Sequence, residues 1–249
     1  MLGLGLGLGG AARQGANAFD PASIFGASDD GAVYIAAPSS TFQVSNGTTA
    51  VSENDPVGYL TDLSGKGNHA IQTTPGARPT MRLSGGRYYL EGDGVDDFLV
   101  CLGPELSGTH SAVVAVRASD NIASPYGIHG GFWGAVRLNA STGRWQRQIQ
   151  TSAVADTTTI DVSGVLHVLS VVHPTNSETT SWVNGANSAG AVDPRNDALT
   201  GQGIAILTNQ TGAFSGGAVD FYCGVFIDRA ITNEERALCE AWAASVAGV

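Results

Sequence analysis

Short runs of strand-forming residues, separated by turn residues, follow one another along most of the chain. Each run spans about five to ten residues rich in β-branched or aromatic side chains, and clusters of Gly, Asn, Asp, Ser or Pro bound it. Asn46-Gly47 and Asn184-Gly185 supply the positive φ angles that tight hairpins need. The pattern predicts an all-β fold, a two-sheet antiparallel sandwich of the jelly-roll type. Strands are expected at 32–36, 57–61, 87–91, 98–102, 111–117, 130–138, 144–151, 165–172, 179–183, 203–207 and 218–227.

One segment near the end of the sequence breaks this pattern. Thr232 and Glu235 have the spacing of a capping box, which begins a helix. Small or apolar residues then recur at helical spacing, opposite charged residues. We therefore expect one amphipathic helix over 232–247. Its buried face is expected to hold Ala237, Leu238, Ala241, Trp242 and Ser245, and its exposed face Glu234, Arg236 and Glu240.

Residues 1–18 form a low-complexity arm in which Leu2, Leu4, Leu6 and Leu8 alternate with glycine. If the arm is extended, the four leucines lie on one face, because side chains alternate across a strand. Glycine makes such a strip costly to order, so we expect a surface to hold it. That surface is either the chain's own sandwich or a neighbouring chain whose sheet the arm extends.

Composition excludes several classes of function. The 12 Lys and Arg are scattered, and with 22 Asp and Glu they leave a formal charge of −10, so no nucleic-acid binding is expected. No apolar run approaches the ~20 residues that cross a bilayer, so no membrane insertion is expected. The cysteines lack C-x-x-C spacing, and we expect free thiols, buried or half-buried, at Cys101, Cys223 and Cys239.

Two motifs of turn residues lie in the first half of the chain. Residues 60–70 read L-T-D-L-S-G-K-G-N-H-A, and residues 89–99 read Y-L-E-G-D-G-V-D-D-F-L. Together with W-V-N-G at 182–185 and the segment 226–235, they resemble the laminin-G-like, concanavalin A-like lectin/glucanase domains. Those domains carry a D-x-S-G-x-G-N-H-A turn and an F-D-G-x-D-D-x-L element, and Gly92 departs from the second. The resemblance covers about residues 20–247 and implies a concanavalin-like sandwich.

A narrower resemblance concerns the F-D-P-A-S sequence at 19–23 and the D-R-x-I-T-x-x-E sequence at 228–235. Both are similar to single-domain forms encoded in tailed-phage and prophage genomes. The resemblance implies a non-enzymatic protein of the virion surface, either a capsid decoration or cement protein or a fibre-associated protein. Its partners would be capsid or tail proteins and, because virion symmetry repeats contacts, further copies of itself as a homo-oligomer. Host surface polysaccharide would be an additional ligand.

We expect the chain to consist of an N-terminal anchoring arm and one domain. Residues 1–25 would anchor the chain to the particle, and residues 26–249 would form the sandwich with its helix. The anchoring side chains would be Leu2, Leu4, Leu6, Leu8, Phe19 and Phe25.

Polar side chains of the two motifs are the candidate ligand-binding residues. Concanavalin-like domains recognise sugars through loop carboxylates and amides, sometimes with Ca²⁺ held by oxygen ligands. No other cofactor is expected, and the metal is left open. The same residues also have a structural interpretation, because Asp and Asn beside Gly satisfy turn amides. The candidates are Asp62, Asn68, Asp93, Asp96 and Asp97.

Two alternative functions compete with a structural protein of the virion: a tail-tip receptor-binding lectin, and a glycoside hydrolase or polysaccharide lyase. Glu91, Asp93 and Asp96 approximate the E-x-D-x-x-E strand of sandwich-fold glucanases, whose carboxylates flank the glycosidic bond. The last of them is Asp, one methylene shorter than Glu. The Q-I-Q triplet at 148–150 lacks the His that a sandwich-fold lyase would use as its base. The sequence therefore predicts no catalytic residues.

Overall fold

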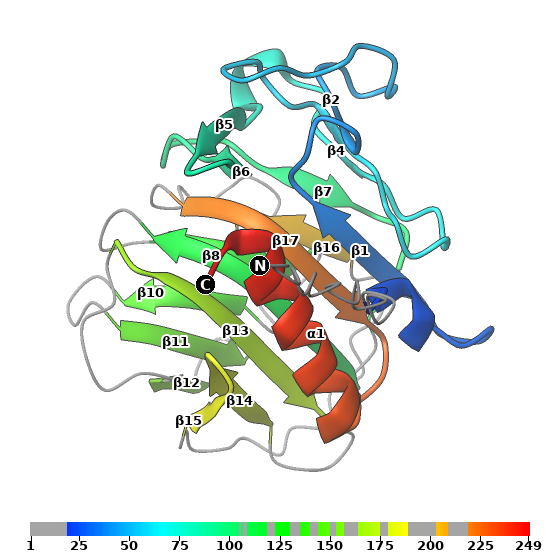
Figure 1. Cartoon of the computed structure of the whole chain (residues 1–249), viewed down its shortest axis with the longest axis vertical. Coiled ribbons are helices and arrows are strands. Elements are labelled where there is room, and N and C mark those ends of the chain that lie inside the picture. Colours follow the sequence, from blue (N-terminus) through cyan, green and yellow to red (C-terminus); the bar gives the residue numbers. More distant parts are fainter. Residues whose placement is uncertain are drawn as a thin grey trace, which may run out of the picture.

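A computed structural model describes residues 19–104, 106, 109–118, 123–129, 135–139, 144–149, 153–156, 164–174, 179–188, 203–208 and 219–249. Two antiparallel sheets form a sandwich, and helix α1 (Asn233–Ala247) packs on the outer face of one of them, as Figure 1 shows. The predicted fold class is thus confirmed. The predicted extended arm, with Leu2, Leu4, Leu6 and Leu8, lies outside the described residues.

Sheet A carries the helix and has the order β15-β14-β13-β8-β17-β6-β5. Strand β1 also pairs with β17, through Cys223–Ile227, beyond the two residues of β17 that pair with β6. Its strands are β1 (Gly31–Ile35), β5 (Thr80–Ser84), β6 (Arg87–Glu91), β8 (His110–Ala118), β13 (Leu166–His173), β14 (Thr180–Val183), β15 (Ala186–Ser188) and β17 (Val219–Ile227).

Sheet B forms the other layer and has the order β12-β11-β10-β9-β16-β7-β4-β3-β2. Its strands are β2 (Thr41–Phe42), β3 (Tyr59–Leu60), β4 (Ala70–Ile71), β7 (Leu99–Cys101), β9 (Ala123–His129), β10 (Ala135–Asn139), β11 (Arg144–Ile149), β12 (Ala153–Asp156) and β16 (Gly203–Ile206). Two 3₁₀ turns complete the described elements: η1 (Pro21–Ile24), which Asp20 caps by accepting from Ala22 N–H, and η2 (Pro75–Ala77).

Several strands differ from the prediction. The run expected at 130–138 is β10 at Ala135–Asn139, and the preceding strand β9 was missed. Strands β2 and β4 were also missed, because two-residue strands carry no readable alternation. Strand β5 was missed as well. It forms because the Gly85-Gly86 turn folds it back onto β6.

An apolar core fills the space between the two sheets. Tyr34 of β1 is fully buried there, and its ring lies 5.9 Å from that of Phe226 on β17. Burial of such side chains is the main favourable contribution to folding. Other members of this core are Leu60, Leu90, Leu99, Val114, Trp145, Leu169, Ile204 and Phe221.

A second apolar layer lies on the outer face of sheet A, beneath α1 and η1. Val113, Val168 and Val225 of the central strands meet the helix in this layer. Strands β8, β13 and β17 are therefore apolar on both faces, as a strand between two layers must be. The molecule thus has three layers: sheet B, sheet A and the helix.

The helix buries a different face from the predicted one. Its capping box is confirmed, since Thr232 N–H donates to Glu235 Oε2 at 2.8 Å and Glu235 N–H donates to Thr232 Oγ1 at 3.1 Å. Of the five predicted positions, Trp242 is half-buried, whereas the other four are exposed. The residues that face sheet A are Cys239, Ala243 and Ala247, one turn apart. Their small side chains let the helix lie close to the strands.

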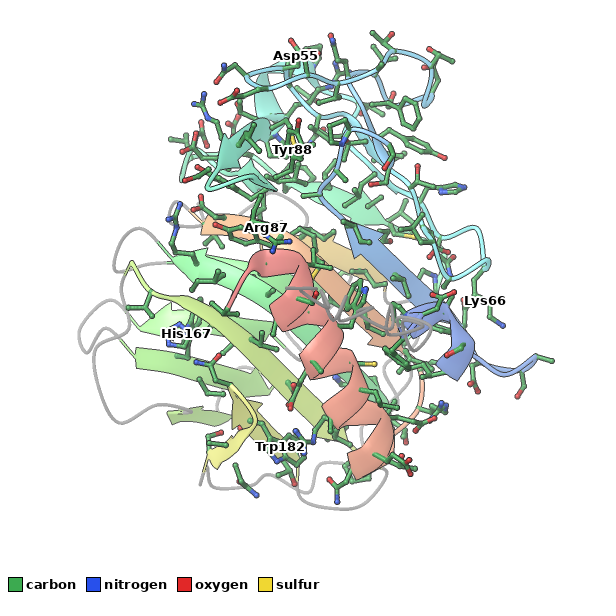
Figure 2. The ribbon with its side chains drawn as sticks, viewed as in Figure 1. Asp55, Lys66, Arg87, Tyr88, His167 and Trp182 are labelled. Atoms are coloured by element: carbon green, nitrogen blue, oxygen red, sulfur yellow. The ribbon has the colours of Figure 1, made fainter. Side chains whose placement is uncertain are left out.

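Glu240 is buried despite its charge. Ser170 Oγ and Arg236 Nη1 both donate to its Oε1 at 2.6 Å, which offsets the cost of removing the carboxylate from water. Arg236 in turn lies 4.3 Å from the ring centre of Trp182. Figure 2 shows Trp182 beside the beginning of α1 and Arg87 at its other end, where Arg87 Nη1 donates to Val246 O.

The described part of the chain holds free thiols at Cys101, Cys223 and Cys239, all of them buried, as predicted. No described helix is long and apolar enough to cross a membrane.

Candidate functional site

Asp62 lies at the start of the first motif turn, just after β3, and is 6% exposed. Its Oδ1 accepts from the backbone N–H groups of Val33 and Ser64, at 2.9 and 2.8 Å. Its Oδ2 accepts from Ser64 Oγ at 2.8 Å and from Asn68 N–H at 3.0 Å. Both oxygens are therefore engaged in joining the turn to β1.

Asn68 closes the same turn and is 8% exposed. Its Nδ2 donates to Asp30 Oδ1 and to Gly31 O, each at 2.6 Å, and its carbonyl oxygen accepts from the Tyr34 hydroxyl. A Cβ at Gly103 would lie 2.4 Å from Asn68 Oδ1, so glycine is required for this close approach. Asp62 and Asn68 thus join the turn to β1, and the segment after β7 packs closely against Asn68.

Asp93, Asp96 and Asp97 form a separate group in the loop between β6 and β7. Their carboxylate oxygens lie within 4.8 Å of one another, and no other His, Cys, Asp or Glu cluster of this kind occurs in the described part of the chain. Asp93 Oδ1 accepts from Val95 N–H at 2.8 Å, and Asp97 Oδ2 accepts from Asp93 N–H at 2.9 Å. Hard oxygen ligands of this kind suit Ca²⁺.

Asp97 is the least exposed carboxylate of this acidic loop. Burial raises its pKa, and the charges of Asp93, Asp96 and Glu91 act in the same direction, so that the pKa reaches about 7 despite the opposing hydrogen bond from Asp93 N–H. The five predicted ligand residues therefore fall into two sets. One set is buried and committed to the turn, and the other is at the surface.

The glucanase-like carboxylates are not arranged along one strand. Strand β6 ends at Glu91, and Asp93 and Asp96 lie in the loop that follows it. Glu91 Oε2 accepts from Arg82 Nε at 2.6 Å across the β5–β6 hairpin.

Phe19 and Phe25, which were predicted to anchor the chain, are half-buried in the outer apolar layer. Arg229 connects this region to the helix. Its Nη2 donates to Ile24 O at 2.7 Å, and its Nε pairs with Asp29 Oδ2 at 2.9 Å. The guanidinium also pairs with Glu235 and lowers the pKa of that carboxyl to about 2. We call Arg229, Asp29 and Glu235 the arginine junction.

An aromatic strip that sequence reasoning missed lies on the outer face of sheet B. Tyr59 pairs across strands with Phe42, their rings 5.8 Å apart, and the His69 ring lies 5.1 Å from Tyr59. Leu60 points into the core, so Tyr59 points outward. His69 Nδ1 accepts from Asp62 N–H at 3.1 Å, which leaves the ring proton of the neutral form on Nε2 as a donor. The sequence offers no signal for this strip, since strand pairing alone brings its members together.

No protein-family model and no curated protein sequence matches the chain. Solved structures do match it. The binding domain of Paraclostridial mosquitocidal protein 1 has a TM-score of 0.56 at 10% identity, over 74% of this chain and 49% of that one. The Trypanosoma rangeli sialidase has a TM-score of 0.56 at 14% identity, over 85% of this chain and 32% of that one. A GH54 α-L-arabinofuranosidase has a TM-score of 0.60 at 13% identity, over 87% and 62%.

The fold is of the concanavalin A-like lectin/glucanase type. The chain spans about half the length of the toxin binding domain and about a third of the sialidase. At such low identity the likeness concerns the fold alone. These neighbours include enzymes and a binding domain, so the fold by itself implies neither catalysis nor binding.

Proposed function

We propose that the chain is a non-enzymatic binding domain of a tailed-phage virion surface, held to the particle through residues 1–25. The arginine junction is the observation that carries this proposal. It connects the two segments whose sequences resemble the phage-encoded forms, since Ile24 follows the first and Arg229 and Glu235 belong to the second. Ile24 is thus tied to the beginning of α1, which fixes the point from which residues 1–25 would reach a partner.

The motif carboxylates are already engaged in hydrogen bonds and ion pairs within the domain, which supports a non-catalytic role. Asp62 is held by turn amides, and Glu91 by Arg82. A general acid or nucleophile must instead reach the substrate with its carboxyl group. Hydrolysis of a polysaccharide that Glu91→Gln or Asp93→Asn abolishes would overturn this assignment.

Copy number per particle is the experiment that tests the virion assignment. The chain would be quantified by mass spectrometry in purified particles against the major capsid protein, with a particle-free lysate as control. We expect the chain in particles. Shell symmetry sets its copy number, on the order of hundreds for a head decoration protein and a handful for a fibre protein. Complete absence from particles would contradict the proposal.

Anchoring has its own test. Deleting residues 2–10 is expected to leave the domain folded, as circular dichroism would show, and to abolish incorporation into particles. Normal incorporation of this folded truncated chain would contradict anchoring through the arm, even if the wild-type chain is present in virions.

The aromatic strip favours one additional role, adhesion to host polysaccharide. Tyr59 and Phe42 offer apolar ring surface, and His69 Nε2–H offers a hydrogen-bond donor beside it. Sugars are bound by such pairs of ring faces and polar groups. We expect Tyr59→Ala to lose at least tenfold in glycan affinity on a host polysaccharide panel, about 1.4 kcal/mol. Leu83→Ala, an exposed change on β5 of the other sheet, is the matched control.

A further inference from the structure

A groove of about 420 Å³ lies between α1, strand β13 and the turn between β14 and β15, on the outer side of sheet A. Its size falls within the range of sites that bind apolar groups. Most of its lining is small or apolar, with one carboxylate and one amide: Val168, Asn184, Gly185, Glu240, Ala241, Ala244 and Val249.

An exposed apolar stripe of the helix continues the groove. Leu238 is 43% exposed and lies one turn before Ala241, on the same face of α1, together with the exposed Ala237. These are the positions whose spacing predicts a buried face. Sheet A does not cover them, because the helix meets the strands through Cys239, Ala243 and Ala247. The chain therefore carries an apolar helix face that the described residues leave without a partner.

We propose that the Leu-Gly segment at residues 2–8 of the same chain docks in this groove. The proposal concerns the isolated domain and goes beyond the particle function proposed above. The point at which the described chain begins supports it. Phe19 and η1 pack in the outer apolar layer, and η1 contacts α1 directly. The preceding 18 residues therefore start on the side of sheet A that carries the groove.

Length allows the contact within one chain. The stretch between residues 8 and 19 spans at most ~36 Å when extended. Helix α1 is ~22 Å long at 1.5 Å per residue, so the leucines can reach any position along it.

Side-chain chemistry makes segment 2–8 a suitable occupant. It carries no charged side chain, and its leucines would enter the groove between Val168 and Ala244. Its glycines would let the backbone approach the small surface of Ala241 and Gly185. Glu240 Oε1 is engaged by Ser170 and Arg236, and Oε2 lies toward Gly185, where a Cβ would be 3.7 Å away. Backbone N–H groups of an extended segment can donate to that oxygen.

A disulfide-trapping experiment tests the docking in the full chain. The variant Leu4→Cys, Ala241→Cys is oxidised mildly at low protein concentration. The native thiols need no removal, because burial raises the pKa of each of them, that of Cys239 to about 12. We expect an intramolecular disulfide between residues 4 and 241, identified by peptide mass spectrometry. The matched control pairs Leu4→Cys with Ser84→Cys, an exposed position at the end of β5.

Three outcomes would overturn the proposal: equal trapping of the two pairs, no trapping at residue 241, or a disulfide-linked dimer as the main product. The dimer would assign the groove to the arm of a second copy.

A stability cycle gives a second, independent readout. Leu4→Ser with Leu6→Ser is expected to lower the melting temperature of the wild-type background by about 2–4 °C. The same two serine substitutions should leave the melting temperature unchanged in an Ala241→Arg background, where the arginine already blocks the groove. Equal losses in both backgrounds would overturn the proposal. The exposed site and the high helix propensity of Arg keep the blocking variant folded.

Discussion

Asp62 accepts hydrogen bonds through both of its oxygens from three other residues, Val33, Ser64 and Asn68. A buried carboxylate is tolerated only where such donors replace its water shell. Turns that combine Asp or Asn with Gly therefore differ in burial between two places of the chain. In the turn that follows β3 these polar residues are buried and structural, whereas Asp93 and Asp96 lie in an exposed loop.

Replacing Asp62 by Ala should destabilise the protein by about 3 kcal/mol, because several buried donors lose their acceptor at once. Urea unfolding with a single transition would measure this loss. Glu53→Ala, which removes an exposed carboxylate, is the control and should cost less than about 0.5 kcal/mol. An equal effect of the two substitutions would contradict the structural role of Asp62.

Asp97 should make stability depend on pH. Its pKa is about 7 in the folded chain, against ~3.9 for an unfolded Asp. The folded state therefore binds more protons between these values, so the contribution is complete below about pH 4 and is lost as the pH rises through 7. Solvent screening of this partly buried group limits it to about 1 kcal/mol. In thermal melts from pH 4 to 8, Asp97→Asn should flatten the profile more than Asp96→Asn. An unchanged slope would show that Asp97 titrates normally.

Two of the strand pairs depend on glycines, where the backbones of neighbouring strands approach closely. A Cβ at Gly203 of β16 would lie 1.9 Å from Cys101 O of β7, so this pair of strands in sheet B leaves no room for a side chain. At Gly31 the corresponding distance is 2.0 Å to Phe226 O, and φ is +137°. These two positions join β16 to β7 and β1 to β17.

Gly203→Ala should therefore cost about 1–3 kcal/mol, because the strands must separate to accept the methyl group. Gly76→Ala is the matched control, since a Cβ there meets nothing within 4 Å. Chemical denaturation of both variants would compare them. If Gly203→Ala is as stable as Gly76→Ala, the β7–β16 pairing differs from the one described.

The whole molecule depends on a helix covering the outer face of sheet A (Figure 1). Without that layer, Val113, Val168 and Val225 would form an exposed apolar surface of the kind that leads to aggregation. The arginine junction and the capping box fix the beginning of the helix, and Arg87 contacts its end.

Two neighbouring alanines distinguish the structural face of α1 from the predicted one. Ala243 is fully buried against sheet A, and Ala241 is exposed beside the groove. Ala243→Arg should destabilise the fold by about 4 kcal/mol or more, since it forces a charge between helix and sheet. Ala241→Arg should keep a cooperative transition within a few degrees of wild type in calorimetry. If Ala241→Arg destabilised the fold more than Ala243→Arg, the buried face of α1 would be the one predicted from residue spacing.

The sequence by itself determined the all-β class, the strands flanked by turn residues, the capped helix and the unpaired cysteines, because these depend on local spacing and turn chemistry. It predicted the polar residues of both motifs but not which were buried. Only the tertiary structure decided which face of α1 meets the sheet, that Asp62 and Asn68 are enclosed while Asp93 and Asp96 are exposed, and that Phe42, Tyr59 and His69 meet. These depend on contacts between residues distant in the chain, whose energies no local pattern encodes.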